Sequence, residues 1–144
     1  MRQKTNPKKK SRKGKAKRMI DVHGVCVADK LFPVTAVSSA TTVNGTGLSV
    51  VDYDCGFKIV FQVNAGTGTT PTLDVKIQDS ADNSAWADLS PALAFTQVTT
   101  TASLQSIGIP SNSVRQFLRA VATTTGTTQT YSYNVIIVGE KANK

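Results

Sequence analysis

Two stretches of the chain alternate between apolar and polar residues with a period of two. Across residues 57–63 (FKIVFQV) Phe57, Ile59, Phe61 and Val63 recur at every second position, and across residues 73–78 (LDVKIQ) apolar residues alternate with Asp, Lys and Gln. A period of two places one side of a segment in a core and the other in water. Each stretch is therefore predicted to be a half-buried β-strand.

Turn-forming residues lie on both sides of these strands. Residues 44–47 (NGTG), 52–56 (DYDCG) and 64–71 (NAGTGTTP) are rich in Asn, Asp and Gly, which tolerate a positive φ and favour turns. Residues 79–84 (DSADNS) are predicted to turn the chain into a hairpin that returns through Trp86, Asp88 and Leu89. Asp, Asn and Ser side chains would satisfy the backbone of that turn, and Trp86 is predicted to anchor the core.

The rest of the pattern adds shorter strands. They are expected at residues 19–27, 34–43 (a weak edge strand), 48–51, 93–98, 104–109, 115–121 and 131–138, with a turn or irregular link at 29–33. Residues 115–121 could form a helix by propensity, but their setting favours a strand. The Thr-rich segment 123–128 is expected to be a loop that joins two adjacent strands.

Composition supports the same class of fold. The chain after Arg18 is rich in Thr, Val, Ala and Ser, and its one Glu is Glu140. Such a composition suits pleated sheets better than helices, and a chain of 144 residues suits one domain. The prediction is an all-β protein: a single β-sandwich or jelly-roll-like domain of about 7–9 antiparallel strands, from the regular spacing of strand and turn signals.

Charge divides the chain into two parts. Residues 1–18 contain ten Lys and Arg residues and no acidic residue. The rest of the chain contains seven Lys and Arg residues and all nine acidic residues, so the positive net charge of +8 comes from this arm. We expect the arm to be disordered when free, followed by a β-sandwich at 19–140 and a polar tail at 141–144. The arm is the candidate polyanion-binding site through ten residues: Arg2, Lys4, Lys8, Lys9, Lys10, Arg12, Lys13, Lys15, Lys17 and Arg18.

Cysteine use and hydropathy bear on the compartment. Cys26 and Cys55 do not make a disulfide framework, and we interpret both as small buried side chains, although they could pair. The longest late apolar run, residues 135–138, is too short to cross a bilayer. We expect a soluble protein made in a host cytoplasm, with no membrane partner.

Candidate chemistry is sparse. His23 is the one histidine, the sequence has no zinc-ligand spacing, Gly-x-Ser-x-Gly elbow or P-loop, and the acidic residues near 79–88 do not follow a calcium-loop pattern. We therefore expect no catalytic residue, no cofactor and no metal, and predict that the protein is not an enzyme. Binding of nucleic acid is assigned to the arm alone, as an electrostatic and sequence-independent contact.

Several segments together resemble a known class of protein. These are Asp21-Val22-His23, residues 43–48, residues 57–63, the hairpin Ile77-Gln78-Asp79-Ser80-Ala81-Asp82-Asn83-Ser84 and the later Phe117-Leu118-Arg119-Ala120-Val121. Over residues 19–140 the chain resembles small β-sandwich virion proteins of tailed phages. The resemblance implies a head decoration or minor capsid protein that binds an icosahedral shell. The arm is not part of the resemblance.

Two structural functions and one cellular alternative remain open. As a decoration or minor capsid component, the chain would bind the major capsid protein or copies of itself in the virion, and its arm would hold acidic shell surface or genomic DNA or RNA. The alternative is a jelly-roll coat protein of a small icosahedral virus, with an internal basic arm that binds the packaged nucleic acid. A cellular binding module with a basic tail is the third possibility.

Overall fold

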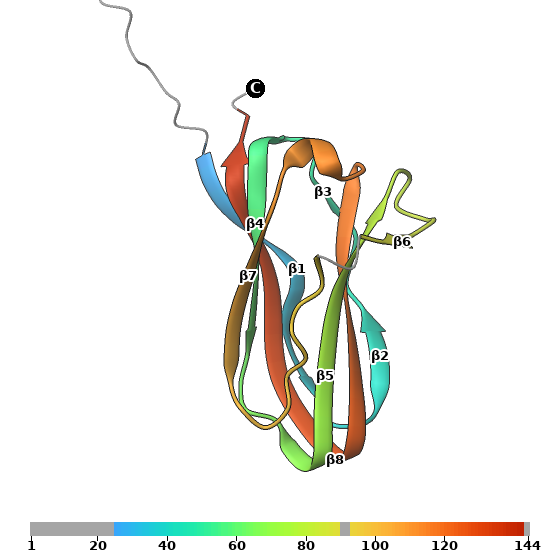
Figure 1. The fold of residues 1–144 in the computed structure, drawn as a ribbon. Coiled ribbons are helices and arrows are strands. Elements are labelled where there is room, and N and C mark those ends of the chain that lie inside the picture. Colours follow the sequence, from blue (N-terminus) through green and yellow to red (C-terminus); the bar gives the residue numbers. More distant parts are fainter. Residues whose placement is uncertain (1–24, 90–92, 143–144) are drawn as a thin grey trace, which may run out of the picture.

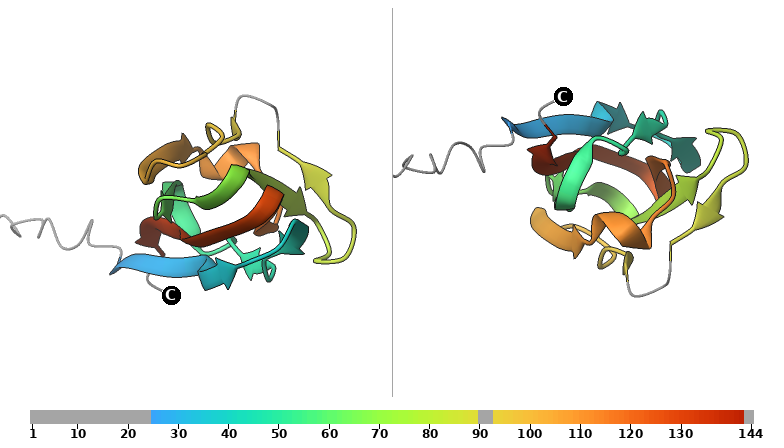
Figure 2. Two further views of the ribbon diagram at one scale, coloured as in Figure 1. Left: turned by 90° about the horizontal axis from the view of Figure 1, so that it is seen from below. Right: turned by 90° about the horizontal axis from the view of Figure 1, so that it is seen from above.

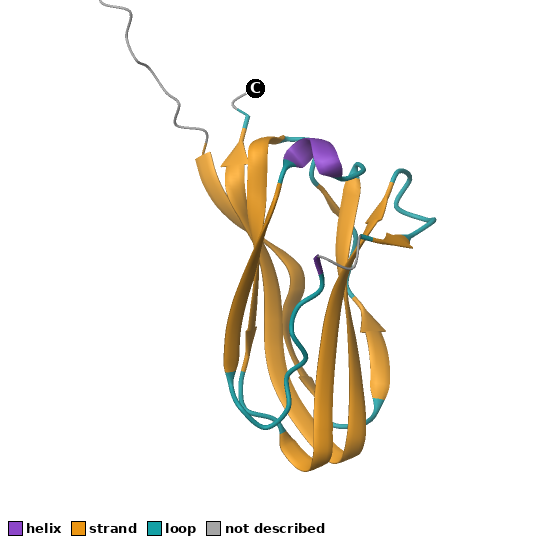
Figure 3. Cartoon of the chain, viewed as in Figure 1, coloured by secondary structure: helices purple, strands orange, loops and turns teal. Residues whose placement is uncertain are grey.

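The computed structural model describes residues 25–89 and 93–142, which form β-strands and one short 3₁₀ helix (Figures 1 and 3). The arm, His23 and most of the predicted strand at 19–27 lie outside these residues. The elements in chain order are β1 (Val25–Val37), β2 (Thr41–Asn44), β3 (Leu48–Ser49), β4 (Tyr53–Val63), β5 (Thr67–Ser80), β6 (Ala87–Asp88), β7 (Ser103–Ile109), the 3₁₀ helix (Ser111–Ser113) and β8 (Phe117–Lys141).

The strands form two antiparallel sheets that share β8. Sheet A has the order β1-β8-β4-β7, and sheet B has β2 and β3 along one side of β8 and β5, then β6, on the other. The end-on views show β1 and β7 at opposite margins of the molecule (Figure 2). The predicted all-β sandwich is confirmed.

The longest strand, β8, belongs to both sheets because it folds over near its middle. Its first half pairs with β5 as far as Thr130, and its second half pairs with β1 from Tyr131 onward and with β4 from Tyr133 onward. At the fold-over Gly126 has a φ of 119° and Thr128 a φ of 52°. β5 bends beside it, with Gly68 at 109° and Thr70 at 48°. This end of the molecule lies at the bottom of Figure 1.

The prediction for the C-terminal third is therefore wrong in one respect. The Thr-rich segment 123–128 lies within β8, and the segments on either side are not neighbouring strands. Each half of the strand finds its hydrogen-bond partner in a different sheet, so the segment that looks like a hairpin loop is a bend in one continuous ribbon. Strand structure at residues 117–121, rather than helix, is confirmed. β8 also includes Lys141, the first residue assigned to the tail.

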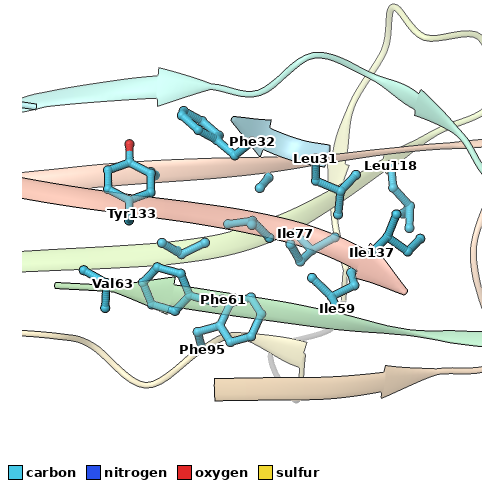
Figure 4. Close-up of a cluster of buried hydrophobic side chains, with 14 of the residues drawn as sticks. Leu31, Phe32, Ile59, Phe61, Val63, Ile77, Phe95, Leu118, Tyr133 and Ile137 are labelled. Atoms are coloured by element: carbon cyan, nitrogen blue, oxygen red, sulfur yellow. The ribbon is translucent and has the colours of Figure 1, made fainter. Parts of the chain in front are cut away.

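The core lies between the sheets, and the two alternating stretches supply one side each. Phe57, Ile59, Phe61 and Val63 on β4 are buried, as are the apolar residues of β5. Figure 4 shows these side chains packed against β1 and β8, with the rings of Phe61 and Phe95 5.2 Å apart. The predicted inward faces of 57–63 and 73–78 are confirmed.

Two predicted core residues lie elsewhere. Trp86 is half-buried under the Arg119 guanidinium rather than in the core, because the hairpin that carries it lies against the outer face of sheet B. Cys55 is a free and exposed thiol, since it lies on the outward side of the irregular start of β4. The side chain of Cys26 lies outside the described part.

The segment 44–47 is not the predicted turn. β2 and β3 both continue along β8, with Asn44 opposite Val121 and Leu48 opposite Leu118, so the chain passes between them without reversing. Neither glycine there has a positive φ. A Cβ atom at Gly45 would lie 2.4 Å from the carbonyl oxygen of Leu31, so close packing of backbones requires that glycine.

Other boundaries differ because pairing with β8 or β4 extends strands through polar or irregular sequence. The expected link at 29–33 lies inside β1, where two register shifts interrupt the regular pairing with β8. The expected edge strand 34–43 is divided between β1 and β2, in different sheets. Residues 67–71 belong to β5, the turn 52–56 contains the start of β4, and 93–98 is coil with one bridge, Leu73 to Val98. The hairpin β5–β6 and the strand at 104–109 are confirmed.

Candidate interaction surfaces

The ten basic residues predicted to bind polyanions lie in residues 1–18, outside the described part of the chain. Of the described residues, β1 begins at Val25, opposite Lys141 at the end of β8, so the described part of the chain starts and ends at the same end of sheet A (Figure 1).

A half-buried polar cluster fixes this end of β1. Asp29 accepts hydrogen bonds from the Tyr53 hydroxyl group at 3.0 Å and the Lys141 ammonium group at 2.5 Å. Lys141 also lies 5.3 Å from the centre of the Tyr53 ring. The hydrogen bond from Lys141 lowers the pKa of Asp29, despite partial burial, and the bond from Tyr53 acts in the same direction. Three strands are thus joined near the start of β1.

The outer face of sheet B is a hydrogen-bonded layer of polar side chains. Arg119 donates two hydrogen bonds to Gln78, which donates one to Asp88, and Asp88 also accepts one from Lys76. The hydroxyl groups of Thr72 and Thr125 are 2.6 Å apart across β5 and β8. These exposed polar groups already hydrogen-bond to one another, so they need no protein partner and this face suits contact with water.

The hairpin between β5 and β6 leans on this polar face. The Asp82 carboxylate accepts hydrogen bonds from the backbone N–H groups of Ser84 and Ala85 and from the Ser80 hydroxyl, which lower its pKa. The Arg119 guanidinium carbon lies 4.4 Å from the centre of the Trp86 ring. The predicted role of Asp and Ser side chains in closing this turn is confirmed.

A third ion pair ties β5 to the segment before β8. The Asp79 carboxylate, largely buried, accepts bonds from the Arg115 backbone N–H and from two guanidinium nitrogens at 2.6 and 3.0 Å. Burial alone would raise the pKa of Asp79, but the bonds from Arg115 outweigh it and lower that pKa. The Arg115 guanidinium is therefore already paired within the domain.

The outer face of sheet A is more apolar than that of sheet B. Val60 on β4 lies opposite Ile136 on β8, next to Val138, and all three are half-buried. Leu104 on β7, opposite Gln62, is 72% exposed. The sequence pattern does not predict this apolar face, because Val60 is the one apolar residue on the polar side of the strand 57–63.

Three shallow hollows in the described residues have volumes of about 170 to 370 Å³, and the largest of these three is lined mainly by Thr, Gln and Ser side chains between 96 and 105. Within residues 25–89 and 93–142, no three His, Cys, Asp or Glu side chains gather closely enough to hold a metal ion. No helix of that part is long and apolar enough to span a membrane.

Comparison with known proteins gives a fold and no family. No protein-family model and no curated protein sequence matches the chain. Solved structures match it at low identity. The capsid protein VP2 of infectious bursal disease virus, in a subviral particle, is 12% identical with a TM-score of 0.52, and covers 80% of this chain and 32% of VP2. The same virus in its T13 particle gives a TM-score of 0.56 over 80% and 31%.

An exported protein shares the same fold. The PBSX exported protein XepA is 16% identical with a TM-score of 0.54, over 82% of this chain and 38% of its own. The chain therefore spans about a third of the length of these structures. What the matches establish is the fold, a β-sandwich shared with these structures.

Proposed function

We propose that the chain is a structural component of a virion, a head decoration or minor capsid protein that binds and stabilises an icosahedral shell. The observation that carries the proposal is the fold: 80% of the chain matches about a third of VP2 of infectious bursal disease virus in a subviral particle. The resemblance of residues 19–140 to virion proteins of tailed phages supports it independently of the fold.

The distribution of polar groups supports a place on a shell. Sheet B presents a layer of Thr, Gln and paired charges, whereas the outer face of sheet A carries half-buried Val and Ile side chains. One face thus suits water and the other suits protein. Many weak, symmetric contacts add up on a shell because each additional contact is made within an assembled particle.

The arm supplies the second half of the proposal. It precedes β1 in the chain, and the Asp29–Tyr53–Lys141 cluster holds the start of β1 against β4 and β8. The arm would bind acidic shell surface or packaged genomic DNA or RNA through charge, without base recognition.

A jelly-roll coat protein with an internal arm is the second candidate. The observation that favours it is that the matching domain of VP2 comes from a subviral particle. Expression of the full chain alone separates the two. Decoration predicts that closed shells do not form and that the chain attaches to shells made by another protein. Closed shells containing nucleic acid would contradict decoration, and assembly only onto shells made by another protein would contradict the coat protein.

A further inference from the structure

Of the edge strands in the two sheets, β7 alone lacks any feature that blocks pairing with another strand. An exposed strand edge offers unpaired N–H and C=O groups, and proteins protect such edges with short strands, bulges, charges or proline. On sheet B the edge strands β2, β3 and β6 are four, two and two residues long. On sheet A, β1 contains two register shifts, Pro33 and the charged Asp29 and Lys30.

In contrast, β7 is a regular strand of seven residues with the sequence SLQSIGI. It contains no charge and no proline, and all seven residues pair with β4 without a register shift. Among the described residues it is the last strand of its sheet, and no backbone hydrogen bond joins it to the coil before it. That coil is linked to β7 by the Gln105 side chain, which contacts the backbone of Thr96.

The outward side chains of β7 are complementary to a second copy of themselves. Leu104 and Gly108 lie on the outer face, two positions before and two after Ser106. Antiparallel pairing of two copies about Ser106 would set each Leu104 opposite the partner's Gly108. Leu104 is 72% exposed, and a Cβ atom at Gly108 would meet no atom within 4 Å. The exposed leucine thus has an open backbone surface to cover.

We infer that β7 pairs with β7 of a second copy across a two-fold axis through Ser106, so that two A sheets become one continuous sheet. A contact of this kind is isologous and closes after two copies, because the far edges of the joined sheet are the protected β1 strands. A strand without charges can face its own copy without placing like charges opposite each other. The inference does not depend on the proposed virion role.

The test is a charge exchange at Ser106, which is exposed and lies on the proposed axis. The full chain, freed of nucleic acid and kept at moderate salt to screen the arms, is examined by sedimentation velocity over a range of concentrations. Wild type should form a two-copy species. In Ser106→Lys or Ser106→Asp alone, two like charges meet, and the dissociation constant should rise about fivefold or more.

Mixing the two variants separates a direct contact from a general effect on the strand. Ser106→Lys with Ser106→Asp should form a heterodimer at least as tight as wild type, because opposite charges then face each other. The matched control is Val51→Lys, which places a charge on the other strongly exposed apolar side chain, 60% exposed, outside β7. It should leave the dimer unchanged, and circular dichroism should show each variant folded.

Three outcomes would overturn the inference: a wild-type chain that remains monomeric at its highest soluble concentration, a Ser106→Lys variant that dimerises as well as wild type, or a mixture of the two variants that forms no heterodimer. A shell-binding chain that is monomeric in solution would retain the proposed virion role and refute the β7 contact. The two ideas therefore fail separately.

Discussion

Tyr133 places its hydroxyl group in the core without a hydrogen-bond partner among the described residues. Its ring packs 5.2 Å from that of Phe32, and burial raises its pKa to about 12 (Figure 4). Tyr131, two residues earlier, is equally buried, but its hydroxyl donates to the carbonyl oxygens of Val98 and Thr99. The two tyrosines form a natural pair for measuring what a satisfied hydroxyl contributes.

We expect Tyr133→Phe to leave the free energy of unfolding unchanged or to raise it by about 1 kcal/mol, because the substitution removes a desolvated and unpaired polar group. Tyr131→Phe should lower it by about 1 kcal/mol, because two carbonyl oxygens lose their donor. Urea unfolding at fixed pH measures both. A larger loss in Tyr133→Phe than in Tyr131→Phe would show that the Tyr133 hydroxyl is bonded, for instance to an ordered water molecule.

The tyrosines also predict the response to alkali. The chain has three, and burial raises the pKa of each, with the Asp29 hydrogen bond adding to the effect at Tyr53. A pKa raised by folding means that the stabilisation is complete below pH ~10, the value in an unfolded chain, and is lost as pH rises toward the folded value. Absorbance of tyrosinate should show much less ionisation near pH 10 in the folded protein than in urea, where about half of each tyrosine is ionised at that pH. A tyrosine that titrates near pH 10 in the folded protein would contradict the burial described.

At the scale of elements, the fold-over of β5 and β8 depends on Gly126. Its φ of 119° is strained for any residue with a side chain, and a Cβ atom would lie 2.9 Å from the Thr70 carbonyl oxygen. Gly126→Ala should therefore lower the free energy of unfolding by about 1–3 kcal/mol.

Gly108→Ala is the matched control for this substitution. Gly108 lies in a strand, lacks a positive φ and has open space around a new Cβ atom, so the substitution should be neutral or slightly stabilising. Thermal unfolding of both variants at a concentration where the chain is monomeric gives the comparison. Equal melting temperatures for the two variants would mean that the bend does not constrain residue 126.

These glycines also show what local sequence can and cannot predict. The alternation in 57–63 and 73–78 identifies strands and their inward faces, because a half-buried strand needs a period of two wherever it pairs. The segments 44–47 and 123–128 contain the same residue types as hairpin turns, yet both continue along a partner strand. Whether a Gly-rich segment reverses or bends depends on which distant strand pairs with it, and that information is not local.

The surfaces also differ in whether local sequence predicts them. The basic arm is evident from charge alone, whereas the apolar outer face of sheet A arises when Val60 meets Ile136 and Val138 from a strand more than seventy residues later. The exposed edge of β7 is likewise a consequence of strand order. Residues 104–109 predict a strand, but only the topology makes it the last one of its sheet.

At the scale of the whole molecule, charge and packing are separable. The described domain holds its own ion pairs, Asp29–Lys141, Lys76–Asp88 and Asp79–Arg115, and buries one core between its sheets. The arm carries ten of the seventeen basic residues and precedes β1. Folding should therefore depend on the sandwich, and binding to polyanions on the arm.

Deletion of residues 1–18 tests that separation. The net charge falls from +8 to −2, because ten basic and no acidic residues are removed. The melting temperature should change little, whereas binding to duplex DNA or polyphosphate at low salt should be lost. For the full chain, released counterions should make affinity for DNA fall about a thousandfold or more between about 50 and 200 mM salt. Replacing the ten basic residues with Gln, at unchanged length, controls for the loss of chain. Two results would refute this separation of folding and binding. Unfolding of the deleted chain would show that the sandwich needs the arm in order to fold. DNA binding that persists in the Gln variant would show that the basic residues of the arm are not what binds.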